Sequence, residues 1–375
     1  MSALFSPYAL GPLSLRNRIV VAPMCQYSAV EGVPQPWHAQ HLGRLALSGA
    51  ALVIVEATGV EARGRISPGD TGLWNEAQET AFAALIRDIR TYSDTPIGIQ
   101  LAHAGRKAST SAPWIDGGRA LRPEEGAWET VAPSAIAFKD GWHTPVALDE
   151  AGMDAVVQAF VDAARRADRA GFDVVELHAA HGYLLSEFLS PVSNRRTDQY
   201  GGSAENRMRF PLRVAQALRD AWPRTKALGA RFNGSDWVED GITDDEVQAF
   251  GRALHAMGYD YLHLTSGGNV ARARIPGAEP GYQLPFAAGV KAAAPDATVI
   301  AVGMIYEPHQ AEAIVASGQA DLVAIARAAL DDPHWPLHAA AALGVTDPAA
   351  APWPAQYGRA TPETWSAYGR LHSTG

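Results

Sequence analysis

One segment in the middle of the chain shows the unit from which the fold is built: Gly171-Phe172-Asp173-Val174-Val175-Glu176-Leu177-His178-Ala179-Ala180-His181-Gly182-Tyr183. It follows an amphipathic pattern that predicts a helix over Glu150–Ala170, and its apolar run predicts a buried strand over Val174–His178. Polar residues, His181 and Tyr183 among them, follow the strand directly. This order indicates a parallel α/β fold with its chemistry at the carboxyl ends of the strands.

The same alternation continues along the chain. Short β-branched runs predict eight strands, over Ile19–Ala22, Leu52–Ala57, Ile97–Leu101, Val174–His178, Ala230–Asn233, Leu262–Thr265, Val299–Val302 and Leu322–Ala326. Apolar residues at helical spacing predict helices over Trp37–Leu47, Glu76–Tyr92, Glu150–Ala170, Ala204–Ala221, Asp244–Met257, Pro285–Ala294, Pro308–Ala316 and Pro333–Leu343. Eight strand–helix units are the number that closes a (β/α)8 TIM barrel. The alternative, an open doubly wound sheet, usually has a glycine-rich loop after its first strand, and Ala22-Pro23-Met24-Cys25 is not one.

Composition restricts the class of protein. The chain has 375 residues, of which 47% are hydrophobic, and this suits one elaborated barrel domain over residues 1–375. The net charge is −9 with dispersed Lys and Arg, so we expect neither a nucleic acid nor a membrane as partner. The N-terminus lacks a signal-peptide pattern, and the one cysteine, Cys25, allows no intrachain disulfide and no cysteine-ligated iron–sulfur cluster. We therefore expect a cytoplasmic protein.

Two segments interrupt the alternation. Residues 105–148 separate the third strand from the third helix and contain Trp114 and Trp128. A connection this long is usually functional, so we expect a cap over the catalytic face, with a decorative insertion as the alternative. Residues 344–375 form a C-terminal arm that has aromatic residues but no helical period.

Polar residues at the predicted carboxyl ends of the strands would meet on one face of the barrel, where TIM barrels hold their active sites. Arg231 stands out because a buried guanidinium requires an anion or several acceptors. That acceptor is a bound ligand, or else Glu176 or Glu56. A purely structural role is the alternative for three further candidates, Cys25, Gln100 and Tyr183.

His178 and His181 are three residues apart, a spacing that zinc sites use. A zinc site needs at least three protein ligands, and no third ligand lies within the motif, so we predict no metal. The other interpretation is a pair of ring N–H donors directed at one oxygen, as in an oxyanion site. Gly303 and Arg327 follow the last two strands, where such barrels frequently bind phosphate.

Four motifs resemble those of the old yellow enzyme family. They are Ala22-Pro23-Met24-Cys25-Gln26-Tyr27, Ile99-Gln100-Leu101-Ala102-His103-Ala104-Gly105-Arg106-Lys107, His178-Ala179-Ala180-His181-Gly182-Tyr183-Leu184, and Ser193-Asn194-Arg195-Arg196-Thr197-Asp198-Gln199-Tyr200-Gly201-Gly202-Ser203 with Glu205-Asn206-Arg207. Cys25 and Tyr27 resemble the bacterial "thermophilic-like" class, which includes xenobiotic reductases. The resemblance extends from about Leu4 into the C-terminal tail.

This resemblance implies FMN as cofactor, NADPH or NADH as reductant, and an activated alkene such as an enone, enal or maleimide as substrate. The flavin-binding residues that it implies are Pro23, Met24, Cys25, Ala57, Gln100 and Arg231 for the ring, and Gly303, Ala326 and Arg327 for the phosphate. The implied catalytic and substrate-binding residues are His178 and His181 for the substrate oxygen, Tyr183 for the proton, Tyr27 for substrate binding, and Cys25 for the reactivity of the flavin.

Two positions depart from the family pattern. Ala326 stands where the family commonly has glycine, but its backbone N–H is retained, so we expect phosphate binding to persist. Val302 stands where some relatives have tryptophan, which implies more room beside the flavin.

The arm sequence Gln356-Tyr357-Gly358-Arg359 resembles an arm that, in this class, reaches the active site of the adjacent subunit, with Arg359 as its arginine finger. The resemblance thus implies a homodimer or a tetramer of dimers. A tail that folds back on its own barrel is the alternative. Two other functions are possible: a Schiff-base aldolase, which needs a lysine that the predicted strands do not carry, and a non-catalytic flavin- or phosphate-binding scaffold.

Overall fold

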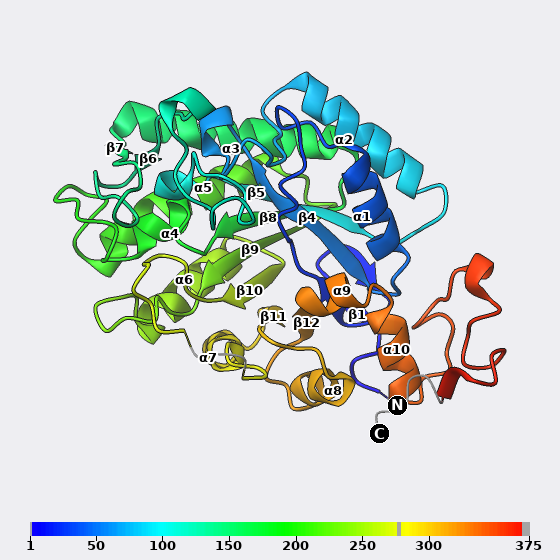
Figure 1. Cartoon of the computed structure of the whole chain (residues 1–375). Coiled ribbons are helices and arrows are strands. Elements are labelled where there is room, and N and C mark those ends of the chain that lie inside the picture. The colour runs from blue at the N-terminus through cyan, green and yellow to red at the C-terminus, as the bar shows by residue number, and fades with distance from the viewer. Residues whose placement is uncertain (1, 276–278, 370–375) are drawn as a thin grey trace.

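Eight parallel strands form a closed barrel at the centre of the computed structural model, which describes residues 2–275 and 279–369 (Figure 1). The strands follow one another around the barrel in the order β10-β11-β12-β3-β4-β5-β8-β9. Their bounds are β3 (Ile19–Val21), β4 (Leu52–Gly59), β5 (Ile97–Ala102), β8 (Val174–Ala179), β9 (Ala227–Asn233), β10 (Tyr261–Thr265), β11 (Val299–Ala301) and β12 (Leu322–Ile325). The predicted TIM barrel is confirmed, and each predicted strand is present with small shifts at its ends.

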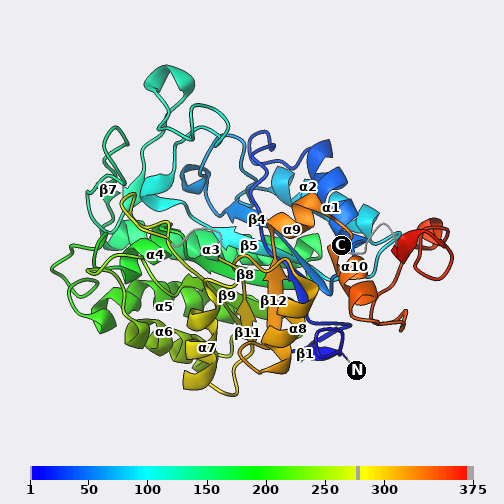
Figure 2. The same ribbon diagram turned by 60° about the horizontal axis from the view of Figure 1, so that its bottom comes forward.

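Helices surround the strands on the outside of the barrel (Figures 1 and 2). The longer ones are α1 (Pro36–Ala46), α2 (Glu76–Ile89), α3 (Glu150–Ala170), α5 (Ala204–Ala221), α6 (Asp244–Ala256), α7 (Leu284–Ala293), α8 (Pro308–Ala316) and α10 (Trp335–Ala342). Side-chain oxygens of Asn75, Asp149, Ser203 and Thr243 cap the amino ends of four of them. Within the described part of the chain, no helix has the length and hydrophobicity needed to cross a membrane.

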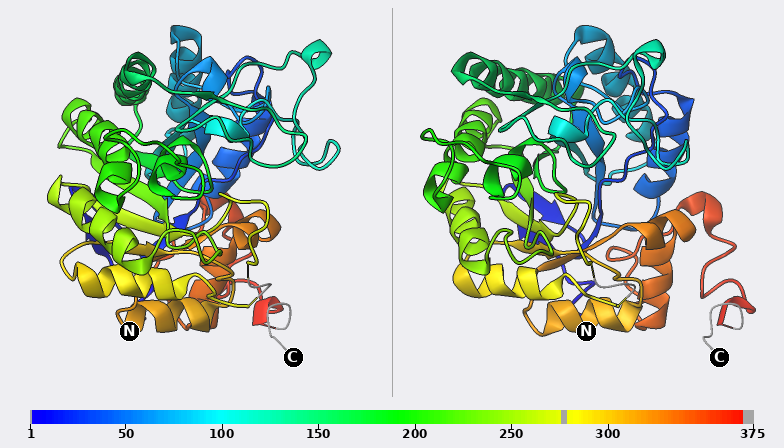
Figure 3. Two further views of the ribbon diagram at one scale, coloured as in Figure 1. Left: turned by 90° about the vertical axis from the view of Figure 1, so that its left-hand side faces the viewer. Right: turned by 60° about the vertical axis from the view of Figure 1, so that its left-hand side comes forward.

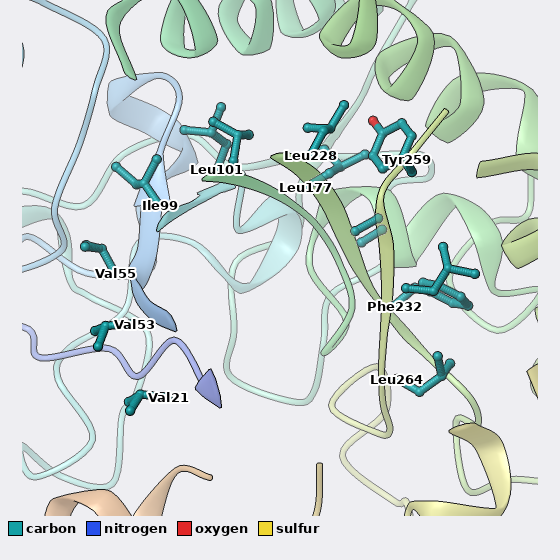
Figure 4. Close-up of a cluster of buried hydrophobic side chains, with 14 of the residues drawn as sticks. Val21, Val53, Val55, Ile99, Leu101, Leu177, Leu228, Phe232, Tyr259 and Leu264 are labelled. Carbon is teal, nitrogen blue, oxygen red and sulfur yellow. The ribbon is translucent and has the colours of Figure 1, made fainter. Parts of the chain in front are cut away.

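Both faces of the barrel wall are buried, because alternate residues of a strand point to opposite sides. One set packs between the strands and the helices, and Figure 4 shows part of it: Val21, Val53, Val55, Ile99, Leu101, Leu177, Leu228, Phe232 and Leu264. The other set fills the inside of the barrel: Val20, Leu52, Ile54, Val174, Ile300, Leu322 and Ala324. The strand sequences are therefore apolar on both faces, except near their carboxyl ends.

A hairpin that the sequence analysis did not predict precedes the barrel. It consists of β1 (Tyr8–Leu10) and β2 (Leu13–Leu15), which pair antiparallel. Leu10 and Leu15 are almost fully buried and belong to the same apolar cluster as the barrel interior. The hairpin therefore extends the apolar core inside the barrel.

The insertion at residues 105–148 has little regular structure, namely η2 (Gly105–Lys107), η3 (Pro123–Glu125) and a two-stranded pairing of β6 (Val131–Ala132) with β7 (Val146–Ala147). Its Trp128 donates a hydrogen bond from Nε1 to the backbone oxygen of Arg63, at 2.9 Å. The guanidinium of Arg65 lies 5.2 Å from the Trp74 ring and 5.0 Å from the Trp128 ring. These contacts fix the insertion to the segment that follows β4.

The C-terminal arm leaves the barrel after α10 and projects beside it (Figures 1 and 3). Its first part packs on its own subunit, since Trp353 stacks on His334 with ring centroids 6.2 Å apart and an interplanar angle of 16°. The backbone oxygen of Ala350 also accepts a hydrogen bond from Asn17, at 2.9 Å. The arm then forms the short turn η4 (Ala355–Tyr357). Residues 370–375 of the predicted arm lie outside the described residues.

The structure corrects the element assignments at three short helices. α4 (Leu184–Leu189) and α9 (Arg327–Asp331) have six and five residues, which is too short for a helical period to show in the sequence. The predicted helix Pro333–Leu343 begins only at Trp335, because His334 is its N-cap residue.

We predict that Gly229→Ala destabilises the protein. Gly229 lies opposite Tyr261 in the pairing of β9 with β10, and a Cβ atom at residue 229 would overlap the buried Tyr261 ring. Overpacking of this kind typically costs about 1–3 kcal/mol, measured as a fall in the free energy of unfolding in urea. Gly289→Ala in α7 is the matched control, since a Cβ there meets only a side-chain nitrogen at 3.7 Å. Equal stability of the two variants would contradict the packing argument.

Candidate active site

An open cavity of about 570 Å³ lies at the carboxyl ends of the strands. The sequence-predicted residues that line it are His181, Arg231, Gly303, Ala326 and Arg327. Of the other predicted residues, all but Arg359 of the C-terminal arm follow β3, lie on β4, β5 or β8, or, for Tyr183, follow β8, and these strands are consecutive in the barrel. The barrel therefore gathers residues far apart in the sequence on one face.

Pro23, Met24 and Cys25 follow β3 directly and are partly exposed. Ala57 on β4 is opposite Gln100 on β5, where the register of the two strands shifts between Val55 and Ala57. The shift is a β-bulge-like irregularity at Glu56, and such features redirect side chains near active sites. Ala57 and Gln100 are 5% and 2% exposed, so both side chains are held inside the protein.

Arg231 on β9 is buried, with 7% of its surface exposed. Within the described residues its guanidinium forms no ion pair, and its Nε atom is buried without a hydrogen-bond partner. Burial lowers the pKa of Arg231, and the nearby Glu176 carboxylate opposes that shift. A buried cation that borders a cavity and lacks an acceptor is suited to bind an anion or a carbonyl-rich ligand edge.

Glu176 and Glu56 were both possible partners of Arg231 on the sequence alone. The structure gives both of them other hydrogen bonds. Glu176 accepts from Gln100 Nε2 at 2.7 Å, and its other oxygen is 2.9 Å from His263 Nδ1. Glu56 accepts from the backbone N–H of Gln26, at 2.7 Å. A bound ligand thus remains the natural acceptor for Arg231.

His178 and His181 lie at the end of β8 with their rings 5.1 Å apart and nearly perpendicular. His178 Nε2 and His181 Nδ1 are 3.3 Å apart, so the two nitrogens converge on one point. His178 Nδ1 accepts a hydrogen bond from the backbone N–H of Ala180 at 3.1 Å, and the ring proton must therefore be on Nε2. Burial, followed by the charge of Arg231, lowers the pKa of both histidines well below the ordinary value. Both rings are neutral at neutral pH.

Thr265 at the end of β10 determines the tautomer of His181. Its Oγ1 is 3.0 Å from His181 Nε2 and 3.2 Å from Gln283 Oε1. The hydroxyl has one proton. If Thr265 gives that proton to Gln283, His181 carries its own proton on Nε2. If Thr265 gives it to His181, the ring proton is on Nδ1, and both histidines then present an N–H to the same point.

His181 is held in an uncommon backbone conformation with φ of 59°. Asn233 Oδ1 accepts a hydrogen bond from its backbone N–H at 3.1 Å, and Lys107 Nζ donates to its backbone oxygen at 2.9 Å. Backbone strain of this kind is found at functional sites, where the surrounding contacts enforce it.

Tyr183 comes next in the chain, and its ring centroid is 5.0 Å from that of His178. Burial raises its pKa well above 10, and the neighbouring Cys25, Tyr27 and Asp70 raise it further. The phenol therefore keeps its proton across the ordinary pH range. The ammonium group of Lys107 lies 5.1 Å from the Tyr183 ring.

Cys25 and Tyr27 belong to the loop after β3. Tyr27 has a positive φ of 49°, and its ring meets the Trp114 ring of the insertion edge-on with centroids 5.5 Å apart. Burial raises the pKa of the Cys25 thiol well above its ordinary value, and the neighbouring Asp70 and Glu56 raise it further. Cys25 is thus a neutral thiol, not a thiolate.

Gly303 and Met304 follow β11, and both have positive φ, 122° and 52°. A side chain at residue 303 would meet the amide of Gln283 at 2.6 Å, so the loop requires glycine there. Arg327, exposed at the mouth of the cavity, contacts the sulfur of Met304 at 2.9 Å. Among the described residues it has no recorded carboxylate partner, which leaves the cation available for an anion.

The sequence analysis missed several cavity residues, among them Thr265, Ser266, Tyr282 and Gln283. Thr265 and Ser266 end a strand that was predicted, so their position was a usable signal. Gln283 comes from a loop whose path the sequence does not reveal.

Two other features considered from the sequence are a metal site and the position of Arg359. Among the described residues, no group of three His, Cys, Asp or Glu side chains is arranged to hold a metal ion. Arg359 is exposed on the arm and is not among the residues that line the cavity of its own chain.

Comparison with known proteins identifies the family. Residues 3–344 match the model of the NADH:flavin oxidoreductase / NADH oxidase family. The chain is 42% identical over 360 residues to a protein named NADPH dehydrogenase from Geobacillus thermodenitrificans (strain NG80-2), covering 96% of this chain and 98% of the relative.

Solved structures agree. Morphinone reductase superimposes with a TM-score of 0.75 at 30% identity, over 93% of this chain and 92% of that one. A complex of 2-naphthoyl-CoA reductase gives a TM-score of 0.81 at 26% identity, but the chain spans only 52% of that longer protein. The chain therefore belongs to the NADH:flavin oxidoreductase / NADH oxidase family, that of the old yellow enzymes, and is an NAD(P)H-dependent flavin oxidoreductase.

Proposed function

We propose that this enzyme is an FMN-dependent ene-reductase, which uses NADPH or NADH to reduce the C=C bond of α,β-unsaturated carbonyl compounds. One observation carries the proposal: a buried cation without an acceptor, Arg231, lies next to two neutral histidines whose nitrogens converge on one point. Across β8 and β9, Arg231 is the direct register partner of His178. The guanidinium of Arg231 suits the edge of a flavin ring, and the two histidine rings suit a substrate oxygen.

The residues present fit FMN. Arg231 would face the electron-rich edge of the flavin ring. The rest of the ring's binding site would be formed by Pro23, Met24, Cys25, Ala57 and Gln100. Gly303, Ala326 and Arg327 would hold the single phosphate, with a backbone that can approach closely and a cation at the cavity mouth. Bound there, the flavin supplies a hydride carrier that passes two electrons from the nicotinamide to the alkene.

The histidine pair would bind and polarise the substrate. Both rings are neutral, so His178 can present its Nε2–H to the carbonyl oxygen without a competing charge. His181 adds a second N–H when Thr265 donates its proton to His181 Nε2. Polarisation of the carbonyl makes the β-carbon accept hydride and places developing negative charge on the oxygen. Preorganised donors at such an oxygen typically contribute 10²–10³ in rate.

Tyr183 would supply the proton that completes the reaction. Hydride adds to the β-carbon, and the α-carbon must then take one proton for the atoms and electrons to balance. The phenol is protonated in this site, and its ring adjoins that of His178. Tyr27 and Cys25 would contact the substrate and the flavin from the loop after β3. Val302 would leave room for bulky alkenes.

A neighbouring subunit would complete the site. Arg359 is exposed on the arm, which extends beside the barrel (Figure 3), while the ring of the nearby Tyr357 contacts His334 of its own chain. An exposed arginine on such an arm can reach a second copy, and mutual exchange gives a dimer or a tetramer of dimers. Arg359 would then pair with polar substrate groups in the partner's site.

The first prediction from this proposal concerns the purified enzyme. We expect a yellow protein whose released chromophore has the mass of FMN, since no glycine-rich pyrophosphate loop for FAD is present. Addition of NADPH without oxygen should bleach the absorbance, and cyclohexenone should restore it. A chromophore of another mass, or colour that cyclohexenone does not restore, would refute the proposal.

A second prediction concerns Tyr183→Phe. This variant keeps the ring but loses the proton, so reoxidation by cyclohexenone should slow by about 10²–10⁴. Reoxidation by a quinone, which takes its protons from solvent, should change little. Because the pKa of Tyr183 is raised well above 10, the wild-type rate with cyclohexenone should not fall between pH 7 and pH 9 through loss of this proton. Equal slowing with both acceptors would indicate that Tyr183 only packs.

A third prediction concerns the arm. Deletion of residues 353–375 should weaken the oligomer in sedimentation and raise KM for enones, while FMN stays bound. Arg359→Ala should raise KM without dissociating the subunits, because it removes one charged contact only. Arg122→Ala, an exposed arginine of the insertion, serves as the charge-matched control. A fully active monomer after the deletion would exclude a shared site.

A further inference from the structure

A set of hydrogen-bonded polar side chains lies inside the barrel beside the candidate site. Glu176 on β8 accepts from Gln100 on β5 at 2.7 Å and is 2.9 Å from His263 on β10. Glu176 and His263 are completely buried, and Gln100 is 2% exposed. The set therefore bridges strands on both sides of Arg231, which belongs to β9.

Burial and the neighbouring side chains determine the protonation states of Glu176 and His263. Burial would raise the pKa of Glu176, but His263, Arg231 and Gln100 together lower it below the ordinary range. Burial lowers the pKa of His263 although Glu176 opposes the shift, so its ring is neutral. Its Nδ1–H donates to Glu176, and its Nε2 is buried without a partner among the described residues. The result is a buried anion near the buried cation Arg231.

The barrel does not need this anion for packing. On the side away from the cavity the interior is a continuous apolar cluster, and Ile300, the register partner of His263 on β11, is part of it. Burial of a carboxylate costs free energy that hydrogen bonds only partly return, and apolar replacements of buried ionic groups are often neutral or stabilising. The orphaned Nε2 of His263 adds a further cost. The set therefore has its effect on the groups that face the cavity.

The set acts on two residues of the proposed flavin-binding site, Gln100 and Arg231. Glu176 takes the amide nitrogen of Gln100, which leaves the amide oxygen on the opposite side as an acceptor. Glu176 also places a negative charge close enough to Arg231 to act on its guanidinium. With FMN held as proposed, both effects would act at the edge of the ring that faces Arg231, where negative charge develops on reduction.

We propose that Glu176, held by His263, is a positioning residue that fixes the amide of Gln100, offsets part of the charge of Arg231, and so sets the reduction potential of the flavin. This inference rests on the proposed binding of FMN beside Arg231. His263 has the auxiliary role of keeping Glu176 ionised through its Nδ1–H bond.

The test is the midpoint potential of the bound flavin, measured against a redox dye in the holoenzyme. Glu176→Gln removes the negative charge and retains the shape, so the anionic reduced flavin becomes more stable and the potential rises. We expect the equilibrium constant for reduction to increase by about ten-fold or more, which is about 30 mV for a two-electron couple. Ile300→Val is the matched control, because it changes packing in the same layer without changing charge.

A pair of His263 variants supports the same test. His263→Leu removes the donor to Glu176 and should raise the potential in the direction of Glu176→Gln. His263→Gln keeps an uncharged N–H donor and should stay near the wild type. If Glu176→Gln fails to fold or to hold flavin, this pair decides the question by itself.

The outcomes separate the two proposals. A wild-type protein without FMN would overturn the proposed function, and the inference with it. FMN in the wild type, with Glu176→Gln or the His263→Leu and His263→Gln pair at the wild-type potential, would overturn the inference and leave the proposed function intact. A potential shift in Ile300→Val as large as that in Glu176→Gln would assign the effect to packing, and would equally overturn the inference.

Discussion

Closure of the eight parallel strands is the constraint on which the site depends. In a closed barrel every second residue must face inward, and the pairing register decides which residues meet there. His178 on β8 is paired with Arg231 on β9, and Arg231 is paired with His263 on β10. A slip by one residue would turn any of these side chains toward the helices. The short distances in the site are therefore consequences of register, which the apolar residues on the other face hold in place.

Burial then determines the charge state of each group. The same loss of solvent lowers the pKa values of His178 and His181 and raises that of Tyr183, so all three are neutral. Arg231 keeps its charge because its ordinary pKa is so high that no shift seen in proteins neutralises it. Neutral donors beside one permanent cation can stabilise negative charge that develops during a reaction without being titrated themselves.

The regular elements were predictable because they carry local signals. α3 and α5 have the predicted bounds: α3 begins at the cap Asp149 and ends at Gly171, and α5 begins at the cap Ser203. The helices α4 and α9 were not predictable, since five or six residues show no helical period. The β1–β2 hairpin was not predictable either, because its three-residue strands, Tyr8–Leu10 and Leu13–Leu15, contain no β-branched residue.

For the candidate site, position at a strand end was sufficient to select His178, His181 and Arg231. It was not sufficient to find the partners, because hydrogen bonds such as that from Thr265 to Gln283 join a strand to a distant loop. For the same reason the sequence could not decide between Glu176 and Glu56 as partners of Arg231. That choice depends on strand register and side-chain direction, which only the structure gives.

Depth along the barrel axis separates the residues that stabilise the fold from those suited to chemistry. Leu10 and Leu15 of the hairpin, Leu52 and Leu322 are part of an apolar interior, in which Gly229 makes room for the ring of Tyr261. Farther along the same strands the inward positions become polar, from Glu176 to His178 on β8 and from Gly229 to Arg231 on β9. A polar group costs least where a cavity and a ligand can satisfy it, which is the open carboxyl end. Glu176 is placed at the transition between the two regions, so its charge acts on the site while its surroundings belong to the core.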